Sequence, residues 1–145
     1  MITLYVLCGI PASGKTTLAK ELAEQTGAKV HSLDDVASYW GEPDPDGKLH
    51  KQWIANIKAD LQNGNSVVCD STALTSIGRR WILDQFSDIN CKKVLTVKAV
   101  PVEVCLERNE NRVPKVTEKH IRKAASVLEA PTKDEGWDAI YLSRE

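Results

Sequence analysis

A glycine-rich run near the N-terminus restricts the fold of this chain more than any other feature. Residues 9–16 read Gly-Ile-Pro-Ala-Ser-Gly-Lys-Thr and follow directly on the apolar segment 2–8. Glycine at positions 9 and 14 lets backbone amides approach a ligand closely, so the spacing predicts a buried strand that turns sharply into a helix. The amides and the positive end of the helix dipole favour phosphate groups at this turn. A chance glycine turn is the alternative, but the strand before the run and the helix after it favour binding of a nucleoside triphosphate.

The residue types in this loop predict their roles. Lys15 is expected to reach the β- and γ-phosphates, and the hydroxyl of Thr16 is expected to be a ligand of Mg²⁺. The rest of the predicted nucleotide-binding loop consists of Gly9, Ala12, Ser13, Gly14 and Thr17. ATP and Mg²⁺ are therefore the predicted cofactors.

Strand-like and helix-like segments alternate along the whole chain. Apolar and β-branched runs predict strands at residues 2–8, 28–32, 66–69, 93–100 and 137–142. Helical spacing and terminal signals predict helices at residues 14–25, 75–86, 101–109 and 117–128, and another that contains residues 53–61. Such alternation is typical of a parallel sheet with helices on both faces. We therefore expect an α/β fold with about five strands, a ligand at their carboxyl ends, and a single domain over residues 1–145.

Composition excludes several classes of protein. The net charge is −1, so the chain has no overall basic field that would hold long nucleic acid nonspecifically. Its four cysteines show no C-x-x-C spacing, which favours reduced thiols in a cytoplasmic setting. The chain starts without a basic leader, and no apolar run approaches the roughly 20 residues that span a bilayer. We expect a cytoplasmic protein with no membrane contact and no evident protein partner.

The segment after the second predicted strand supplies a candidate catalytic acid. Motifs that read guanine or mark transporters and helicases (N-K-x-D, L-S-G-G-Q and D-E-x-D/H) are missing from the sequence. Instead, Asp34 and Asp35 follow the strand, where a carboxylate can lie across from the γ-phosphate. An acceptor hydroxyl needs such a group to orient it and to take its proton. The alternative is that Asp34 caps a helix that begins at Asp35.

A second acid stands at the end of the strand predicted over 66–69. Asp70 follows Val67-Val68-Cys69 and precedes Ser71 and Thr72. Its carboxylate is expected either to hold Mg²⁺ through water or to anchor an arginine that faces the substrate. Aspartate at a strand end also starts turns, which is the structural alternative.

Two arginines follow the helix start at Pro101. Arg108 and Arg112 lie four residues apart, so on a helix they share one face. On a short helical lid, two guanidinium groups can clamp a transferring phosphate and neutralise the charge on its oxygens. The alternative is a solvated surface on which they pair with Glu107 and Glu110.

The remaining polar and aromatic residues receive structural interpretations. Surface positions are expected for the basic residues Arg79, Arg80, Lys115, Lys119, Arg122 and Lys123. Core positions are expected for the aromatic residues Trp53, Trp81 and Trp137, and by default for Tyr39 and Trp40, which are also able to stack on a base. The histidines show no metal-ligand spacing.

Four stretches, in order along the chain, resemble the kinase domain of the polynucleotide 5′-hydroxyl kinases, within the wider group of small P-loop kinases. They are residues 9–17, 34–35 and 68–72, and Arg108-Asn109 with Arg112. A fifth stretch, residues 129–140 with Glu135-Gly136-Trp137, is similar to the closing segment of that family. The resemblance covers nearly the whole chain and implies a P-loop kinase fold with a short helical lid.

The resemblance also implies a role for each matching side chain. Asp34 matches the general base, and Arg112 matches the lid arginine that stabilises the transition state, with Arg108 beside it. Asp70 matches an acid of the acceptor pocket, and Thr72 belongs to the same stretch. Lys15 and Thr16 match the groups that handle ATP and Mg²⁺.

Two positions depart from the family pattern. A basic residue often precedes the general base in that family, and the phage-type member has an arginine three positions after it. Leu33 and Ala37 stand at these places in this chain. The loss of two phosphate-contacting groups bears on the identity of the acceptor more than on the chemistry.

The sequence therefore predicts an ATP-dependent phosphotransferase that moves the γ-phosphate to the 5′-hydroxyl end of DNA or RNA. One alternative is a P-loop kinase of a nucleoside, a small metabolite or a hydroxymethylated DNA base. Another is a non-kinase module that binds ATP and regulates a partner. No phosphatase module accompanies the predicted kinase domain.

Overall fold

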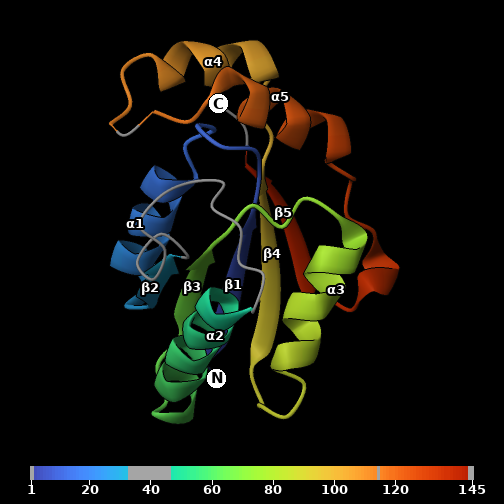
Figure 1. Ribbon diagram of the computed structural model, residues 1–145. Helices are drawn as coiled ribbons and strands as arrows, with labels where there is room; N and C mark the ends of the chain where they lie inside the picture. The colour runs from blue at the N-terminus through green and yellow to red at the C-terminus, as the bar shows by residue number, and fades with distance from the viewer. Residues whose placement is uncertain (1, 33–46, 114, 144–145) are drawn as a thin grey trace.

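The described part of the chain alternates strands and helices as the sequence predicts. The computed structural model describes residues 2–32, 47–113 and 115–143. Five strands form one sheet there (Figure 1): β1 (Thr3–Cys8), β2 (Lys29–Ser32), β3 (Val67–Asp70), β4 (Lys92–Lys98) and β5 (Ala139–Ser143). The helices are α1 (Lys15–Thr26), α2 (Lys48–Gln62), α3 (Ser76–Gln85), α4 (Val102–Asn109), α5 (Glu118–Val127) and the 3₁₀ helix η2 (Lys133–Glu135).

The sheet is parallel throughout, with its strands in the order β2-β3-β1-β4-β5. β1 lies in the middle, where Tyr5 is paired with Val68 of β3 and with Val94 of β4. Strands that are covered on both faces need nearly continuous apolar runs, which is what the sequences of β1, β3 and β4 provide. Because all strands run in one direction, their carboxyl ends share one edge, and the loops that follow them meet there.

Helices cover both faces of this sheet. On one face, Trp53 and Ile57 of α2 and Ile82 of α3 pack in a core with Leu4 of β1. On the other face, Ala19 of α1 packs with Leu7 and Val68. The predicted α/β architecture, a five-stranded parallel sheet with helices on both faces, is confirmed.

α4 and α5 lie across the carboxyl edge of the sheet, above the loop that follows β1 (Figure 1). Cys105 of α4, Ile121 of α5 and Val116 from the segment between them form an apolar cluster with Ile10 of that loop. The buried amide of Asn109 joins the two helices, because its Oδ1 accepts from the Val116 backbone N–H at 2.9 Å. α4 corresponds to the predicted short helical lid, and apolar contacts hold α4 and α5 against the phosphate loop.

The structure contradicts two of the burial predictions, both on α3. Arg79 is completely buried, not exposed, whereas Trp81 is 41% exposed and sets its ring edge-on to His50. The inward face of α3 carries Arg79, Ile82 and Leu83, which share one side of a helix because they lie three and four residues apart. Trp81 lies outside this stripe. The core predictions for Trp53 and Trp137 are confirmed, since they are 2% and 8% exposed.

Two further predictions were tested by burial and length. All four cysteines are buried and none forms a disulfide, as expected. Within residues 2–32, 47–113 and 115–143, no helix combines the length and the apolar character that membrane crossing requires.

Candidate active site

The loop after β1 has a tightly constrained backbone. Gly14, the N-cap of α1, has a φ of 97°, and Ala12 has a φ of 65°, both in the left-handed region. The Gly9 N–H donates to the Thr72 carbonyl at 2.9 Å, which joins this loop to the loop after β3. A Cβ on Gly9 would come within 3.0 Å of the Lys98 carbonyl oxygen. Glycine is therefore required at position 9 by close packing and at position 14 by the backbone conformation.

Lys15 folds back over this loop. Its Nζ donates to the Ile10 carbonyl at 3.2 Å, and the residue is only 5% exposed. The pKa of Lys15 is lowered to about 8, chiefly by burial; the carboxylate of Asp70 opposes this shift, and the nearby Arg112 guanidinium adds to it. Because burial disfavours the charged ammonium, a bound anion such as a phosphate would stabilise it.

The hydroxyl of Ser13 lies inside the same loop. Its Oγ is buried and has no hydrogen-bond partner among the described residues. A buried hydroxyl without a partner is uncommon, because its desolvation is not offset by a hydrogen bond. Its position in the loop makes it a donor that a phosphate oxygen can use.

Thr16 and Asp70 are brought together at the start of α1 and the end of β3. The Thr16 Oγ1 donates to the Asp70 Oδ2 at 3.1 Å. Among the described residues, no group of three or more histidine, cysteine or acidic side chains forms a dedicated metal cage. A hydroxyl beside a single carboxylate is nevertheless the kind of donor set that fits Mg²⁺, which takes one or two carboxylates together with phosphate oxygens and water.

The two lid arginines both reach the phosphate loop. The Arg108 Nη1 donates to the Ser13 carbonyl at 2.9 Å. Arg112 lines a hollow of about 360 Å³ that also contains Lys15, Thr16 and Asp70. The carboxylate of Glu110 contacts the Lys115 ammonium at 3.2 Å. The prediction that both arginines lie on one helix is wrong, because α4 ends at Asn109; the turn that follows the helix brings Arg112 to the hollow that Arg108 also lines.

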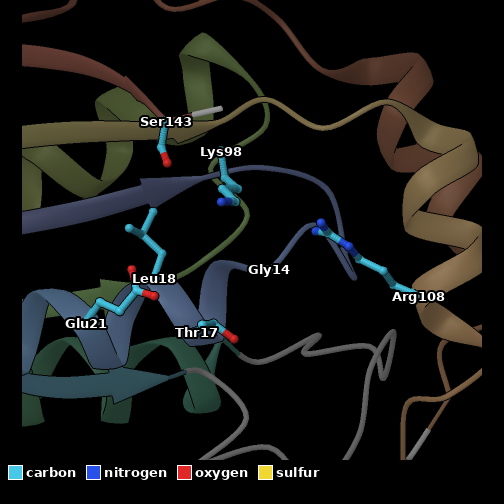
Figure 2. Close-up of a pocket in the computed structure, with 7 residues that line it drawn as sticks. All are labelled: Gly14, Thr17, Leu18, Glu21, Lys98, Arg108 and Ser143. Carbon is cyan, nitrogen blue, oxygen red and sulfur yellow. The ribbon is translucent and has the colours of Figure 1, made fainter. Parts of the chain in front are cut away.

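A second hollow, of about 470 Å³, lies beside the first and shares Gly14, Thr17 and Arg108 with it. Figure 2 shows the side chains that line it: Gly14, Thr17, Leu18, Glu21, Lys98, Arg108 and Ser143. Lys98 and Arg108 both point toward the loop near Gly14, from β4 and α4 (Figure 2). A Cβ on Gly14 would meet the Arg108 Nη1 at 3.3 Å and the Lys98 Cε at 3.4 Å.

Sequence reasoning missed Lys98, Glu21 and Ser143. They come from β4, the middle of α1 and the end of β5, so nothing in their spacing relates them. One signal was available for Lys98, because a charged residue at the carboxyl end of an apolar parallel strand lies at the ligand edge of the sheet.

The other predicted site residues fall into two groups. Thr72 contributes its carbonyl to the Gly9 N–H, while Ala12 and Thr17 line the first hollow. Asp34 lies outside the described residues, as do Leu33, Ala37, Tyr39 and Trp40. The role of Asp34 stays a prediction. Of the basic residues assigned to ordinary surface, Arg122 is exposed and pairs with Glu103 and Glu118.

Relatives of known sequence include two kinases. The chain is 29% identical over 132 residues to the probable thymidylate kinase of Metallosphaera sedula, in an alignment that covers 77% of this chain and 67% of the relative. It is 24% identical over 144 residues to the L-seryl-tRNA(Sec) kinase of Methanococcus maripaludis, which covers 93% of this chain and 56% of the relative. The chain thus spans between about half and two thirds of the length of these relatives.

A solved structure and a family model complete the comparison. Kti12 of Chaetomium thermophilum in complex with ADP–AlF₃ has the same fold, with a TM-score of 0.77 and 19% identity, over 97% of this chain and 88% of that chain. Residues 4–131 match the family AAA_33, described as an AAA domain. The chain therefore belongs to the AAA_33 family and forms a P-loop kinase-like ATP-binding domain.

Proposed function

We propose that this protein transfers the γ-phosphate of ATP to a hydroxyl group, and that the acceptor is the 5′-hydroxyl end of a polynucleotide. The observation that carries the transfer chemistry is the shared hollow of Lys15, Thr16, Asp70 and Arg112. Lys15, Asp70 and Arg112 carry the charges that phosphoryl transfer uses to neutralise the phosphates and to hold the metal. They come from the loop after β1, the end of β3 and the lid.

The triphosphate lies along the phosphate loop in this proposal. Backbone amides at the start of α1 and the Ser13 hydroxyl donate to its oxygens, and Lys15 neutralises the β- and γ-phosphates. The nucleoside occupies the hollow between Lys98 and Ser143, because this hollow adjoins the loop on the side away from Asp70. Thr16 and Asp70 would hold Mg²⁺, which supplies further neutralisation of the phosphate charge when it is bound.

Transfer requires a cation over the transferring group and a base for the acceptor. Arg112 and Arg108 supply positive charge from the lid, where it offsets the negative charge spread over the phosphoryl oxygens. Asp34 aligns the acceptor hydroxyl and takes its proton. The donor, the metal site and the lid arginines therefore surround the place where the acceptor oxygen attacks.

The polynucleotide acceptor is supported by the ordered resemblance to 5′-hydroxyl kinases, in which Asp34, Asp70 and Arg112 match. The L-seryl-tRNA(Sec) kinase of M. maripaludis gives separate support, since the substrate named for that relative is a tRNA that carries an amino acid. A second candidate is a nucleotide as acceptor, which the likeness to the probable thymidylate kinase of M. sedula favours.

The test is transfer from γ-labelled ATP to a panel of acceptors. The panel contains 5′-hydroxyl DNA and RNA oligonucleotides, their 5′-phosphorylated counterparts, thymidylate and free nucleosides. Label on the 5′-hydroxyl ends alone supports the proposal. Label on thymidylate or on a nucleoside would show that the acceptor is that small molecule and not a polynucleotide. ATP binding without any phosphorylated product would favour a regulatory ATP-binding module.

Two neighbouring carboxylates provide a matched pair of variants for the same assay. Asp34→Asn should abolish transfer while ATP binding is retained, because a neutral amide does not accept the proton. Asp35→Asn changes the charge equally and should retain transfer. Equal activity of the two variants would rule out Asp34 as the base.

A further inference from the structure

A buried arginine lies directly beneath the candidate site. Arg79 is 0% exposed, and its guanidinium makes a bidentate pair with Glu135, with Nε to Oε1 at 2.8 Å and Nη2 to Oε2 at 3.0 Å. Its remaining nitrogen, Nη1, donates to the Ala73 carbonyl at 2.8 Å and lies 3.9 Å from the Cys8 Sγ. We infer that Arg79 is a positioning residue that holds the loop after β3 against the phosphate loop, an inference that rests on the proposed function.

Glu135 gives this arginine a fixed anchor. The Trp137 Nε1 donates to the Glu135 Oε1 at 3.0 Å, and the Thr132 backbone N–H donates to Oε2 at 3.2 Å. Burial raises the pKa of Glu135, but the hydrogen bonds from Arg79, Trp137 and Thr132 outweigh it and hold the pKa below its usual value. The carboxylate is therefore charged, and the Trp137 and Thr132 hydrogen bonds fix its position for Arg79.

The group that Arg79 holds is strained. Ala73 has a φ of 45°, a left-handed conformation that is unfavourable for an L-residue with a Cβ. The hydrogen bond from Arg79 to its carbonyl offsets this cost. Thr72, next to Ala73, joins the two loops, since its carbonyl accepts from the Gly9 N–H. The Ser71 Oγ donates to the Leu7 carbonyl of β1 at 3.0 Å, which holds the same loop against the strand that leads into the phosphate loop.

The candidate Mg²⁺ ligands Thr16 and Asp70 are connected to the same loop. Asp70, whose carboxylate accepts from Thr16, lies three residues before Ala73. A buried ion pair alone is weak evidence for stability, because apolar residues of similar volume often do as well. Only a guanidinium, however, donates to a carboxylate through two nitrogens and to a backbone carbonyl through the third. Arg79 thus acts on Asp70 through the backbone of residues 71–73.

The test measures how much Mg²⁺ strengthens ATP binding, by calorimetry with Mg²⁺ and with EDTA. Arg79→Lys keeps the positive charge but lacks the three guanidinium nitrogens that reach Glu135 and Ala73 together. It should reduce the effect of Mg²⁺ on ATP affinity by about tenfold or more, which is the range found when an outer-shell partner of a metal ligand is removed. Asp70→Asn should give a similar loss, and the double variant should lose no more than Asp70→Asn alone. Arg80→Lys, on the exposed side of α3, is the matched control and should keep the full effect of Mg²⁺.

A rescue experiment separates positioning from general destabilisation. Glycine adopts a positive φ without strain, so Ala73→Gly in the Arg79→Lys background should restore most of the Mg²⁺ effect. Thermal unfolding of each variant reports folding independently. If Arg79→Lys does not fold, Glu135→Gln, which keeps one of the two acceptor oxygens for Arg79, takes its place with the same expected loss and the same rescue.

Two outcomes overturn the inference. One is a folded Arg79→Lys protein that keeps the full Mg²⁺ effect, and the other is additive losses in the Arg79→Lys, Asp70→Asn double variant. Failure of the proposed function is distinct, because it appears in the transfer assay of the wild-type protein, whereas the Mg²⁺ effect on ATP binding is measured without any acceptor.

Discussion

The Thr16 hydroxyl donates a hydrogen bond to the Asp70 carboxylate at 3.1 Å across 54 residues of sequence. This contact joins the first turn of α1 to the end of β3 at the carboxyl edge of the sheet. It brings a candidate metal ligand of the phosphate loop next to the acid that ends the neighbouring strand. The sequence left two roles open for Asp70: holding Mg²⁺ through water, or anchoring an arginine that faces the substrate. The contact with Thr16 favours the role in binding Mg²⁺.

Removing the Thr16 hydroxyl should weaken the response to Mg²⁺. Thr16→Val keeps the shape of the side chain but cannot bind a metal, so the Mg²⁺ concentration for half-maximal phosphate transfer should rise by about tenfold or more. A magnesium titration of the transfer rate measures this change. Thr26→Val, at the far end of α1, is the control and should leave the titration unaltered. An unchanged titration for Thr16→Val would exclude the hydroxyl as a metal ligand.

ATP binding should weaken at alkaline pH because of Lys15. Its pKa in the free protein is lowered to about 8, so above this pH the amine is largely neutral and must take up a proton when the triphosphate binds. The dissociation constant should therefore rise with pH above about 8, by at most about tenfold per pH unit. Calorimetry between about pH 7 and about pH 9.5, in buffers of different ionisation enthalpy, measures both the affinity and the proton uptake.

Lys15→Arg is the control for this pH dependence. Arginine stays protonated over the whole range, so its affinity profile should be flat and its proton uptake absent. A wild-type profile that is equally flat would show that Lys15 is already charged in the free protein.

A methyl group at position 9 should damage the loop. In Gly9→Ala the Cβ would meet the Lys98 carbonyl and the Ser13 Oγ at 3.0 Å, so backbone must shift, at a cost of about 1–3 kcal/mol in the free energy of unfolding. ATP affinity should fall together with stability. Gly64→Ala, where a Cβ meets nothing within 4 Å although φ is 85°, should lose about 1 kcal/mol and keep ATP affinity. Urea unfolding and calorimetry separate the two effects.

The buried pair of Arg79 and Glu135 should contribute to stability in an acid-sensitive way. The pKa of Glu135 is lower in the folded protein than its ordinary value of 4.5, so its contribution is fully present above about pH 4.5 and is lost as the pH falls through the lower folded-state pKa. Glu135→Ala leaves the guanidinium buried without its carboxylate and should cost about 3–5 kcal/mol near neutral pH. Chemical unfolding at several pH values measures both.

Glu118→Ala is the comparison for this pair, since Glu118 pairs with Arg122 at an exposed position. Its loss should be no more than about 1 kcal/mol, because an exposed ion pair contributes little. Similar losses for the two variants would show that burial of the Arg79–Glu135 pair adds nothing to its contribution.

The sequence by itself determined the local features of this protein. Glycine spacing identified the phosphate loop, apolar runs located all five strands, and helical periodicity located the helices around them. These signals are readable because each depends on residues close together in the chain. The fold class and the nucleotide-binding edge follow from them, since alternating strands and helices can bury their apolar sides only in a parallel sheet with helices on both faces.

The tertiary structure decided what depends on distant residues meeting. Arg79 looks like an ordinary surface arginine until Glu135 is placed opposite it, 56 residues later. Lys98 and Ser143 share a hollow because β4 and β5 end at the same edge, and Trp81 is exposed because α3 turns Arg79 inward instead. A charge is buried only where a partner offsets its desolvation, and in this chain the partner is supplied by packing between segments whose sequences do not reveal it.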